Sequence, residues 1–315
     1  MVRVRWCLVV LLLWVVPPLA VQLMGECSDT REEAAKKYLE RRGATVEWVT
    51  SLELVSGHST PLETDKHHYH VELDRAWAGG SLQPLRDLPN LRWMIIRSNA
   101  RFHGSDLGVL DKLNDLEVLV LETCAVTDET LQHLRNLKQL RMLCLDHASI
   151  TNRGARHLQV LGNLRNLSLS DTRVGDAGIG NLTEAKKLRR LNLCDTQVGN
   201  RGLRVISENF ARNLEQLQLA GTAVTDRGME MVVQLPHLEI LDLRNTSISD
   251  KGLQSLHRHP NLNFILLNNT NCTPQAISML RQAWKNRDVK VSFDCPHSPR
   301  VPTNSESICE ENPFQ

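Results

Sequence analysis

Leucines recur along the middle of this 315-residue chain at an almost constant interval. Each opens a block of the form Leu-x-x-Leu-x-Leu, with Met or Ile replacing the later leucines in some copies. Successive blocks begin 24 to 26 residues apart, at Leu91, Leu116, Leu140, Leu164, Leu188, Leu214, Leu238 and Leu262. The last two apolar positions of a block are two residues apart, so on a strand they share one face. The pattern therefore predicts one short strand per block, with the intervening side chains on the opposite face.

The second part of each block predicts a turn followed by a short helix. A Thr or another small residue stands in the turn, and the next aliphatic residue points inward. An Asp or Asn then precedes an apolar segment, at Asp128, Asn152, Asp176, Asn200, Asp226 and Asp250. We expect these side chains to cap the first turn of a helix, because their oxygens accept hydrogen bonds from free amides there.

This period and this wording resemble those of leucine-rich-repeat proteins, over about residues 68–293. The phrase Thr-x-Val-Thr-Asp-x-Gly-Leu is similar to two subgroups, exported bacterial proteins with 24-residue repeats and the cysteine-containing repeats of F-box proteins. Thr here usually occupies a turn position where the family often has Asn or Cys. The resemblance implies an α/β solenoid, or horseshoe, with a parallel concave sheet and short convex helices. It implies protein recognition in general.

The chain outside the repeats divides into three further segments. Residues 1–25 have the charged-then-apolar order of a signal peptide, since Arg3 and Arg5 precede an uncharged run; an uncleaved N-terminal anchor is the alternative. Residues 26–67 are expected to form a capping helix and a polar loop over the open end of the solenoid. Residues 68–293 form the solenoid with its C-terminal cap, and residues 294–315 are expected to be a flexible tail.

The balance of charge argues against two kinds of electrostatic attraction, to nucleic acid and to a membrane surface. The chain has 37 Lys and Arg against 36 Asp and Glu, so no bulk field draws it to nucleic acid. A membrane contact is expected only through the N-terminal segment, if that segment is uncleaved.

The candidate binding site lies on the concave face. Outward positions of the first repeats form a contiguous group of apolar residues, called the apolar patch here: Trp93, Ile95, Val118, Val120, Met142 and Cys144. Four polar residues frame it, namely Arg97, Glu122, Asp146 and His147. Such a framed patch is typical of a protein-binding surface. Alternatively, residues 50–67 fold over the patch and make it part of the core.

Two groups of side chains are compatible with a metal, but each has a simpler explanation. His68, His70 and Glu72 alternate along one strand, and a zinc ion accepts such ligands. Asp146, Asp171 and Asp195 recur in adjacent repeats, as a calcium site or a solvated acidic rim. A solvated strand and a solvated rim are the favoured readings, so we predict no metal and no cofactor.

Eight cysteines are present, and removal of Cys7 with a signal peptide leaves an odd number. Cys124 and Cys272 occupy inward positions and are expected in the core. Cys144 and Cys194 are expected to point outward as exposed thiols. They are two repeats apart, about 10 Å, which is beyond the reach of a disulfide bond.

No catalytic constellation is recognisable, because the chain has no phosphate-binding glycine loop, no His-Glu-x-x-His and no nucleophile elbow. We therefore predict an exported, extracytoplasmic, non-enzymatic module that binds a partner protein. The alternatives are a substrate-recognition adaptor of a ubiquitin ligase and a self-associating protein of the cell envelope.

Overall fold

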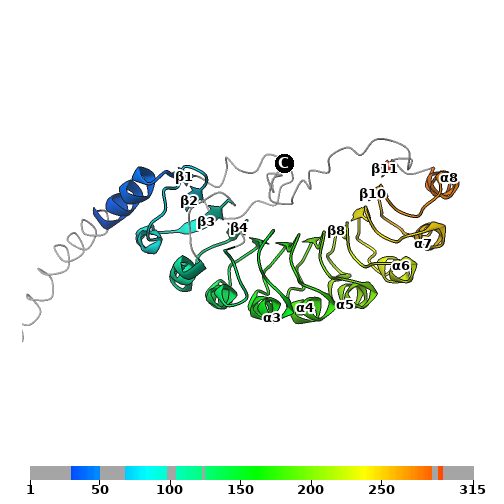
Figure 1. The fold of residues 1–315 in the computed structure, drawn as a ribbon, viewed down its shortest axis with the longest axis horizontal. Coiled ribbons are helices and arrows are strands. Elements are labelled where there is room, and N and C mark those ends of the chain that lie inside the picture. Colours follow the sequence, from blue (N-terminus) through cyan, green and yellow to red (C-terminus); the bar gives the residue numbers. More distant parts are fainter. Residues whose placement is uncertain (1–29, 50–67, 98–103, 123–124, 286–289, 294–315) are drawn as a thin grey trace, which may run out of the picture.

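A single curved sheet organises the molecule. The computed structural model describes residues 30–49, 68–97, 104–122, 125–285 and 290–293. Its eleven strands follow one another in sequence order across the sheet (Figure 1). They are β1 (Ala44–Val49), β2 (His68–Leu73), β3 (Leu91–Ile96), β4 (Val118–Leu121), β5 (Met142–Cys144), β6 (Asn166–Ser168), β7 (Arg190–Asn192), β8 (Gln216–Gln218), β9 (Ile240–Asp242), β10 (Phe264–Leu266) and β11 (Lys290–Ser292). Only β1 is antiparallel to its neighbour, and the other pairs are parallel.

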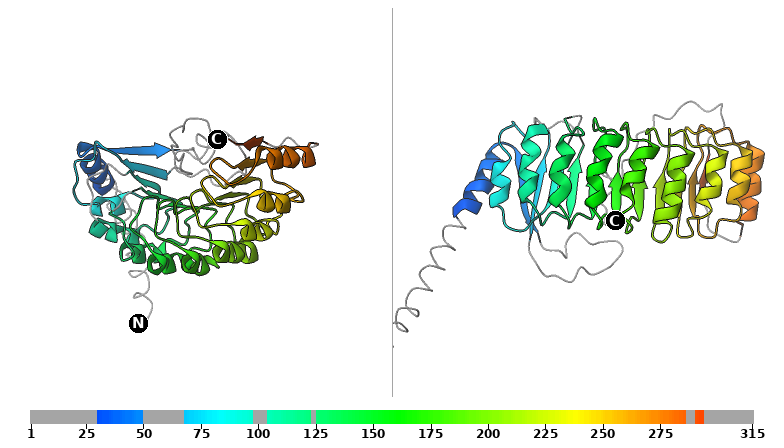
Figure 2. Two further views of the ribbon diagram at one scale, coloured as in Figure 1. Left: turned by 45° about the vertical axis from the view of Figure 1, so that its right-hand side comes forward. Right: turned by 90° about the horizontal axis from the view of Figure 1, so that it is seen from below.

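Short helices cover the convex face of the sheet, side by side along the arc (Figures 1 and 2). The first repeats carry 3-10 helices and the later ones carry α-helices: η1 (Gln83–Asp87), η2 (Gly104–Lys112), η3 (Thr130–Asn136), α3 (Asn152–Ala155) with η4 (Arg156–Val160), α4 (Asp176–Ile179) with η5 (Gly180–Leu182), α5 (Asn200–Phe210), α6 (Asp226–Val232), α7 (Asp250–Leu256) and α8 (Pro274–Ala283). The longest, α5, lies in the one repeat whose leucines are 26 residues apart. The predicted α/β solenoid, with a parallel concave sheet and short convex helices, is confirmed.

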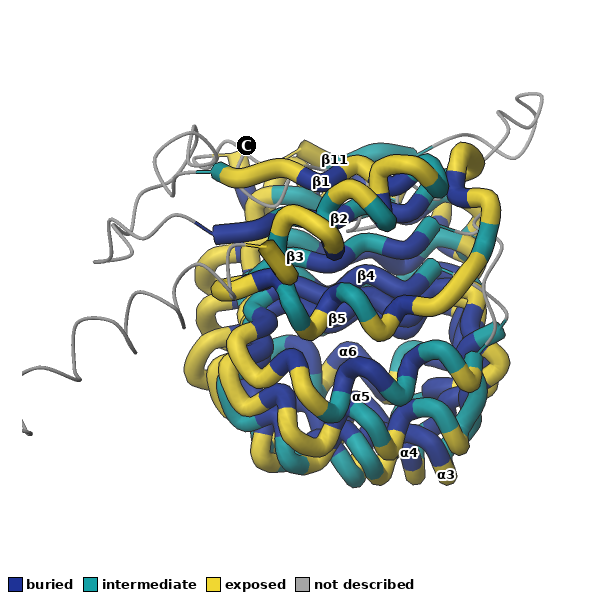
Figure 3. Tube along the Cα trace, turned by 90° about the vertical axis from the view of Figure 1, so that its left-hand side faces the viewer, coloured by how far each residue is buried: buried dark blue, intermediate teal, exposed yellow. Residues whose placement is uncertain are grey.

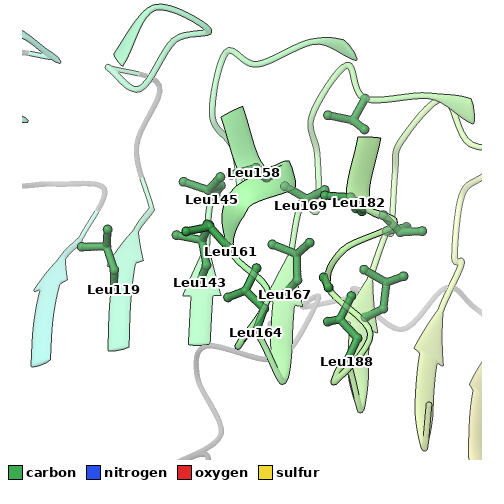
Figure 4. Close-up of a cluster of buried hydrophobic side chains, with 14 of the residues drawn as sticks. Leu119, Leu143, Leu145, Leu158, Leu161, Leu164, Leu167, Leu169, Leu182 and Leu188 are labelled. Carbon is green, nitrogen blue, oxygen red and sulfur yellow. The ribbon is translucent and has the colours of Figure 1, made fainter. Parts of the chain in front are cut away.

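The core lies between the sheet and the helices, and it is built from the repeated leucines (Figure 4). Leu119, Leu143 and Leu167 occupy the same register on adjacent strands and are at most 1% exposed. Burial of one such side chain contributes about 1.5–3 kcal/mol relative to leaving it in water. Because each repeat adds one more layer, the core is continuous along the arc.

The N-terminal end is closed by a helix at residues 30–41, as expected from the sequence. Its Ala35 and Leu39 join the main core. The Tyr69 hydroxyl of β2 donates a hydrogen bond to Glu32 Oε1 of this helix at 2.6 Å. Since β1 pairs with β2, the sheet begins inside the segment that we assigned to the N-terminal cap.

The Asp and Asn residues expected to cap the helices do something else, and that prediction was wrong. From Asn152 on they are the first residues of their helices, whereas Asp128 lies before η3. The preceding residue is the N-cap, and Thr151 of α3 and Ser249 of α7 accept capping hydrogen bonds there, as Thr273 does before Pro274 of α8. The Asp226 carboxylate instead accepts hydrogen bonds from the Ser249 amide at 2.8 Å and from the Ser249 hydroxyl at 2.6 Å, one repeat further on. Five other side chains accept the equivalent hydrogen bond from a backbone amide of the next repeat: Asp128, Asn152, Asp176, Asn200 and Asp250. The side chains therefore join neighbouring repeats.

The turn after each strand explains the preference for Thr. The Thr172 hydroxyl donates to the Leu169 carbonyl at 2.7 Å, and Thr196, Thr222, Thr246 and Thr270 make the same bond. The residue before each of these threonines has a positive φ, from 52° at Asp171 to 67° at Gly221, and His147 before Ala148 has a φ of 60°. Asp, Asn and His tolerate this left-handed conformation better than most residues. The departure from Asn or Cys therefore leaves the solenoid intact.

Four sequence-based expectations concern residues outside the described part of the chain. They are the signal peptide or anchor at residues 1–25, the loop at 50–67, the core position of Cys124 and the tail at 294–315.

Candidate functional site

The six residues of the apolar patch lie together on the concave face. They form a hydrophobic cluster separate from the main core. In the register of the sheet, Trp93, Val118 and Met142 make one row, and Ile95, Val120 and Cys144 make the next. The grouping expected from alternation along the strands is thus present.

The patch is much less exposed than a free sheet surface. Val118 and Met142 are 5% exposed, Val120 is 3% and Cys144 is 0%. Figure 3 shows β4 and β5 in the colour of buried residues. Trp93 and Ile95 lie on β3, on one side of the patch, and both are half-buried. Accessible apolar surface is therefore confined to the β3 side of the patch.

The expected exposed thiol of Cys144 is absent, and that expectation was wrong. Cys144 is buried and forms a disulfide bond. Cys194 carries a free thiol and is 6% exposed, so it too is less open than expected. Burial, and next the negative charge of Asp242, raise the pKa of the Cys194 thiol to about 12, which keeps it protonated. Cys272 has a free thiol in the core, as predicted.

The charged residues at the frame of the patch pair with one another. The Arg97 Nε donates to Glu72 Oε1 at 2.6 Å, and its Nη1 lies 3.9 Å from Glu122 Oε2. The Arg97 side chain is 40% exposed, so its guanidinium remains accessible to a partner. An exposed ion pair of this kind contributes little to stability.

Asp146 does not belong to a solvated acidic rim. It is 1% exposed, and its Oδ1 accepts hydrogen bonds from the Ser168 hydroxyl at 2.5 Å and the Ser170 amide at 2.9 Å. Burial raises the pKa of the Asp146 carboxyl, and these hydrogen bonds oppose the rise. Asp171 is instead exposed at the turn, 3.0 Å from Nδ1 of His147. The pKa of the Asp195 carboxyl is raised, mainly by burial and next by the negative charge of Asp171.

The histidines of β2 pack against the patch. The His68 and His70 rings lie 6.5 Å and 5.6 Å from the Trp93 ring. Burial lowers the pKa of His70, although Glu47 lies 3.8 Å from its Nδ1. Across the described ranges, no three His, Cys, Asp or Glu side chains are placed to hold a metal ion.

One feature of the concave face was missed at the level of sequence. The Arg244 guanidinium donates through Nε and Nη2 to the Asp242 carboxylate, and the Asp242 side chain is 1% exposed. The only signal was a pair of opposite charges two positions apart on one strand, which places both on the same face. Alternation places both residues outward, but it does not show that Asp242 is buried against the Arg244 guanidinium.

One family model and two solved structures are similar to this chain. A family model described as a leucine-rich repeat region matches residues 83–292. An internalin from Listeria monocytogenes aligns with a TM-score of 0.46 and 15% identity, covering 69% of this chain and 71% of that chain. Internalin C2 from the same organism aligns with a TM-score of 0.47 and 22% identity, covering 61% and 84%. No curated protein is similar enough in sequence to match.

The length and hydrophobicity of the described helices test whether one of them could span a membrane. Within the ranges given above, none has both the length and the apolar character needed to cross a bilayer.

Proposed function

Because this chain belongs to the leucine-rich-repeat family, we propose that it is an exported, non-enzymatic module that binds another protein through its concave face. The observation that carries the proposal is the apolar patch, a contiguous cluster on a sheet face that no described helix covers. Ten spacings of about 4.8 Å give a sheet about 48 Å long, which suits a protein-sized partner.

The proposed contact residues are those of the patch and its frame. Trp93 and Ile95 are half-exposed anchors, and aromatic side chains commonly dominate binding energy. Arg97 and the exposed His147 supply polar contacts at the rim. Of the remaining members, Glu122 stands in the frame, whereas Val118, Val120, Met142, Cys144 and Asp146 are buried and support the accessible residues from behind.

Two observations support an extracytoplasmic location. The charged-then-apolar order of residues 1–25 is that of an export signal. The disulfide bond at Cys144 is typical of an oxidising compartment.

The test compares two charge substitutions at positions that share one register row of the sheet. Trp93→Glu changes the patch, and Ile240→Glu is the control on β9, since both residues are half-buried. The mature protein and both variants, matched in circular dichroism and melting temperature, are used to capture proteins from extracytoplasmic extract. We expect one partner to be lost only with Trp93→Glu. Equal capture by all three would place binding elsewhere.

A further inference from the structure

A row of charged residues runs along one edge of the sheet, just before the first concave position of each strand. The amide of each member donates to the carbonyl of the member one repeat earlier, at 2.7 to 2.9 Å, so the residues are stacked in register. In order they are Arg92, Glu117, Arg141, Arg165, Arg189, Glu215 and Glu239, and we call them the charged row. Three arginines are therefore consecutive in adjacent repeats, with carboxylates on either side.

The carboxylates that border the three arginines pair with them. Glu117 bridges two arginines, since its Oε1 lies 3.0 Å from Arg92 Nη1 and its Oε2 lies 3.5 Å from Arg141 Nε. On the other side, Arg189 Nη1 lies 3.2 Å from Glu215 Oε1. Arg165 stands between these paired arginines, and no carboxylate in the described ranges forms an ion pair with it. The charged row therefore lacks one carboxylate, at Arg165.

The surroundings of Arg165 are electropositive and open to water. Its side chain is exposed. Burial of part of that side chain, and next the positive charges of Arg141 and Arg189, lower the pKa of the Arg165 guanidinium. Arg190, the first residue of β7, donates its amide to the Arg165 carbonyl at 3.0 Å and also has no ion-pair partner among the described residues. Because like charges this close repel one another, an incoming anion lowers the electrostatic energy of the group.

The charged row also indicates which anion suits it. Glu117 shows that one carboxylate can bind two arginines of the row, and a guanidinium matches the two oxygens of a carboxylate. The positive stretch from Arg141 to Arg189 spans two strand spacings, or about 10 Å. A long polyanion such as nucleic acid would extend beyond this stretch and meet the like charges of Glu215 and Glu239. A single acidic side chain fits within it.

We propose that Arg165, with Arg190 beside it, binds an aspartate or glutamate side chain of the partner protein. The inference rests on the proposed function, because it names the chemistry of one contact made by that partner. Arg165 precedes β6, which is three strand spacings, or about 14 Å, from β3. Trp93 and Arg165 therefore fit within one interface of standard size. Apolar contact anchors the partner at β3, and the carboxylate contact orients it.

The first experiment replaces the partner by a probe. A fluorescently labelled oligoglutamate peptide is titrated into the full chain at low salt, and binding is followed by fluorescence anisotropy, with an oligoglutamine peptide as the control. Arg165→Glu should weaken oligoglutamate binding about tenfold, because it replaces attraction by repulsion. Arg227→Glu on the convex helix α6 changes the net charge equally and should alter the affinity by less than about twofold, since charges this far away are screened. Equal weakening by both variants, or by neither, would overturn the proposal.

Two neutral substitutions in the charged row test whether unpaired arginines are what the probe binds. Glu215→Gln removes the partner of Arg189 and should tighten oligoglutamate binding about threefold. Glu239→Gln removes the same charge one repeat further on but leaves the arginine pairs in place, so it should tighten binding by less than about 1.5-fold. An equal or larger effect of Glu239→Gln would contradict the proposal. Circular dichroism and melting temperature confirm that all variants are folded.

Duplex DNA serves as the competing ligand. If DNA binds as tightly as the oligoglutamate peptide and Arg165→Glu abolishes both, the site is a general anion surface and the proposal is wrong. Partner capture with Arg165→Glu separates this inference from the proposed function. A partner that is lost with Trp93→Glu but fully retained with Arg165→Glu would reject the carboxylate contact and leave the proposed function intact. Probe binding at Arg165 without any captured partner would reject the proposed function alone.

Discussion

The two halves of the concave face have the same backbone and opposite chemistry. Strands β3–β5 carry the apolar patch, whereas β6–β9 carry a polar stretch: Asn166, Ser168, Arg190, Asn192, Gln216, Gln218, Asp242 and Arg244. Beneath both, the inward leucines are equally buried. The comparison teaches that the inward positions determine the fold, and that the outward positions are free to define a surface.

The two halves also differ in the interactions that their buried side chains make. The polar stretch pairs within itself, as when Asp242 binds Arg244 or Asn192 Oδ1 accepts from the Cys194 amide at 3.0 Å. The patch has few polar atoms to pair, and its burial depends on apolar contact. A polar substitution should therefore be tolerated in one half and not in the other.

The largest expected difference comes from one lysine placed at equivalent positions. Val120 and Gln218 share a register row, but Val120 is 3% exposed and Gln218 is half-buried. Val120→Lys should lower the free energy of unfolding by about 3 kcal/mol, because it buries an unpaired charge. Gln218→Lys should change it by no more than about 0.5 kcal/mol. Urea unfolding measures both, and equal small losses would mean that Val120 is open to water.

The next effect concerns the ion pair of the polar stretch. Arg244→Ala should cost about 2 kcal/mol, since it leaves the buried Asp242 carboxylate without its guanidinium. Adding Asp242→Asn should recover part of that loss, because the buried charge is then gone. Thermal unfolding of the single and double variants tests this. A double variant that is less stable than Arg244→Ala would show that the carboxylate has other support.

A smaller effect lies at the border between the halves, at Asp146. Burial raises the pKa of this carboxyl above its ordinary value of 3.8; Asp171 adds to the rise and His147 opposes it. The folded state thus holds the proton more tightly than the unfolded state. Relative to Asp146→Asn, the natural protein should be most stable below pH 3.8 and should lose that advantage as the pH rises through the folded-state pKa. Unfolding free energies over an acidic pH series measure this. An advantage that grows with pH would contradict it.

The last prediction compares the two cysteines and needs no substitution. In the native protein, iodoacetamide at pH 8 should label neither, because Cys144 has no thiol and Cys194 is buried with a pKa of about 12. After denaturation without reductant, only Cys194 of the two should be labelled; reduction should add Cys144. Labelling of native Cys194 would show that this part of the concave face opens to solvent.

Much of the fold could be predicted from local pattern. Leu119 and Leu121 share a face because strands alternate, and the grouping of Trp93 with Val118 and Met142 follows from stacking repeats in register. The role of Asp226 could not be predicted this way. An Asp before a helix has two possible amide partners, and only the position of the next repeat decides between them.

The prediction of an exposed thiol at Cys144 was wrong for a related reason. Alternation correctly placed it on the concave face, but its burial and its disulfide bond depend on neighbours in space, which alternation along one strand does not reveal. Likewise, the sequence grouped Asp146 with Asp171 as acidic residues of adjacent repeats. One is buried against Ser168 and the other is exposed at a left-handed turn.

The sequence by itself determined the repeat, the strand and helix of each unit, and the set of side chains on the concave face, because these depend on period and alternation within about 24 residues. Only the tertiary structure decided which of those side chains remain open to water, which charges pair and which cysteine is bonded. Burial and pairing are properties of neighbours in space, and in a solenoid the nearest neighbour is a full repeat away in the sequence.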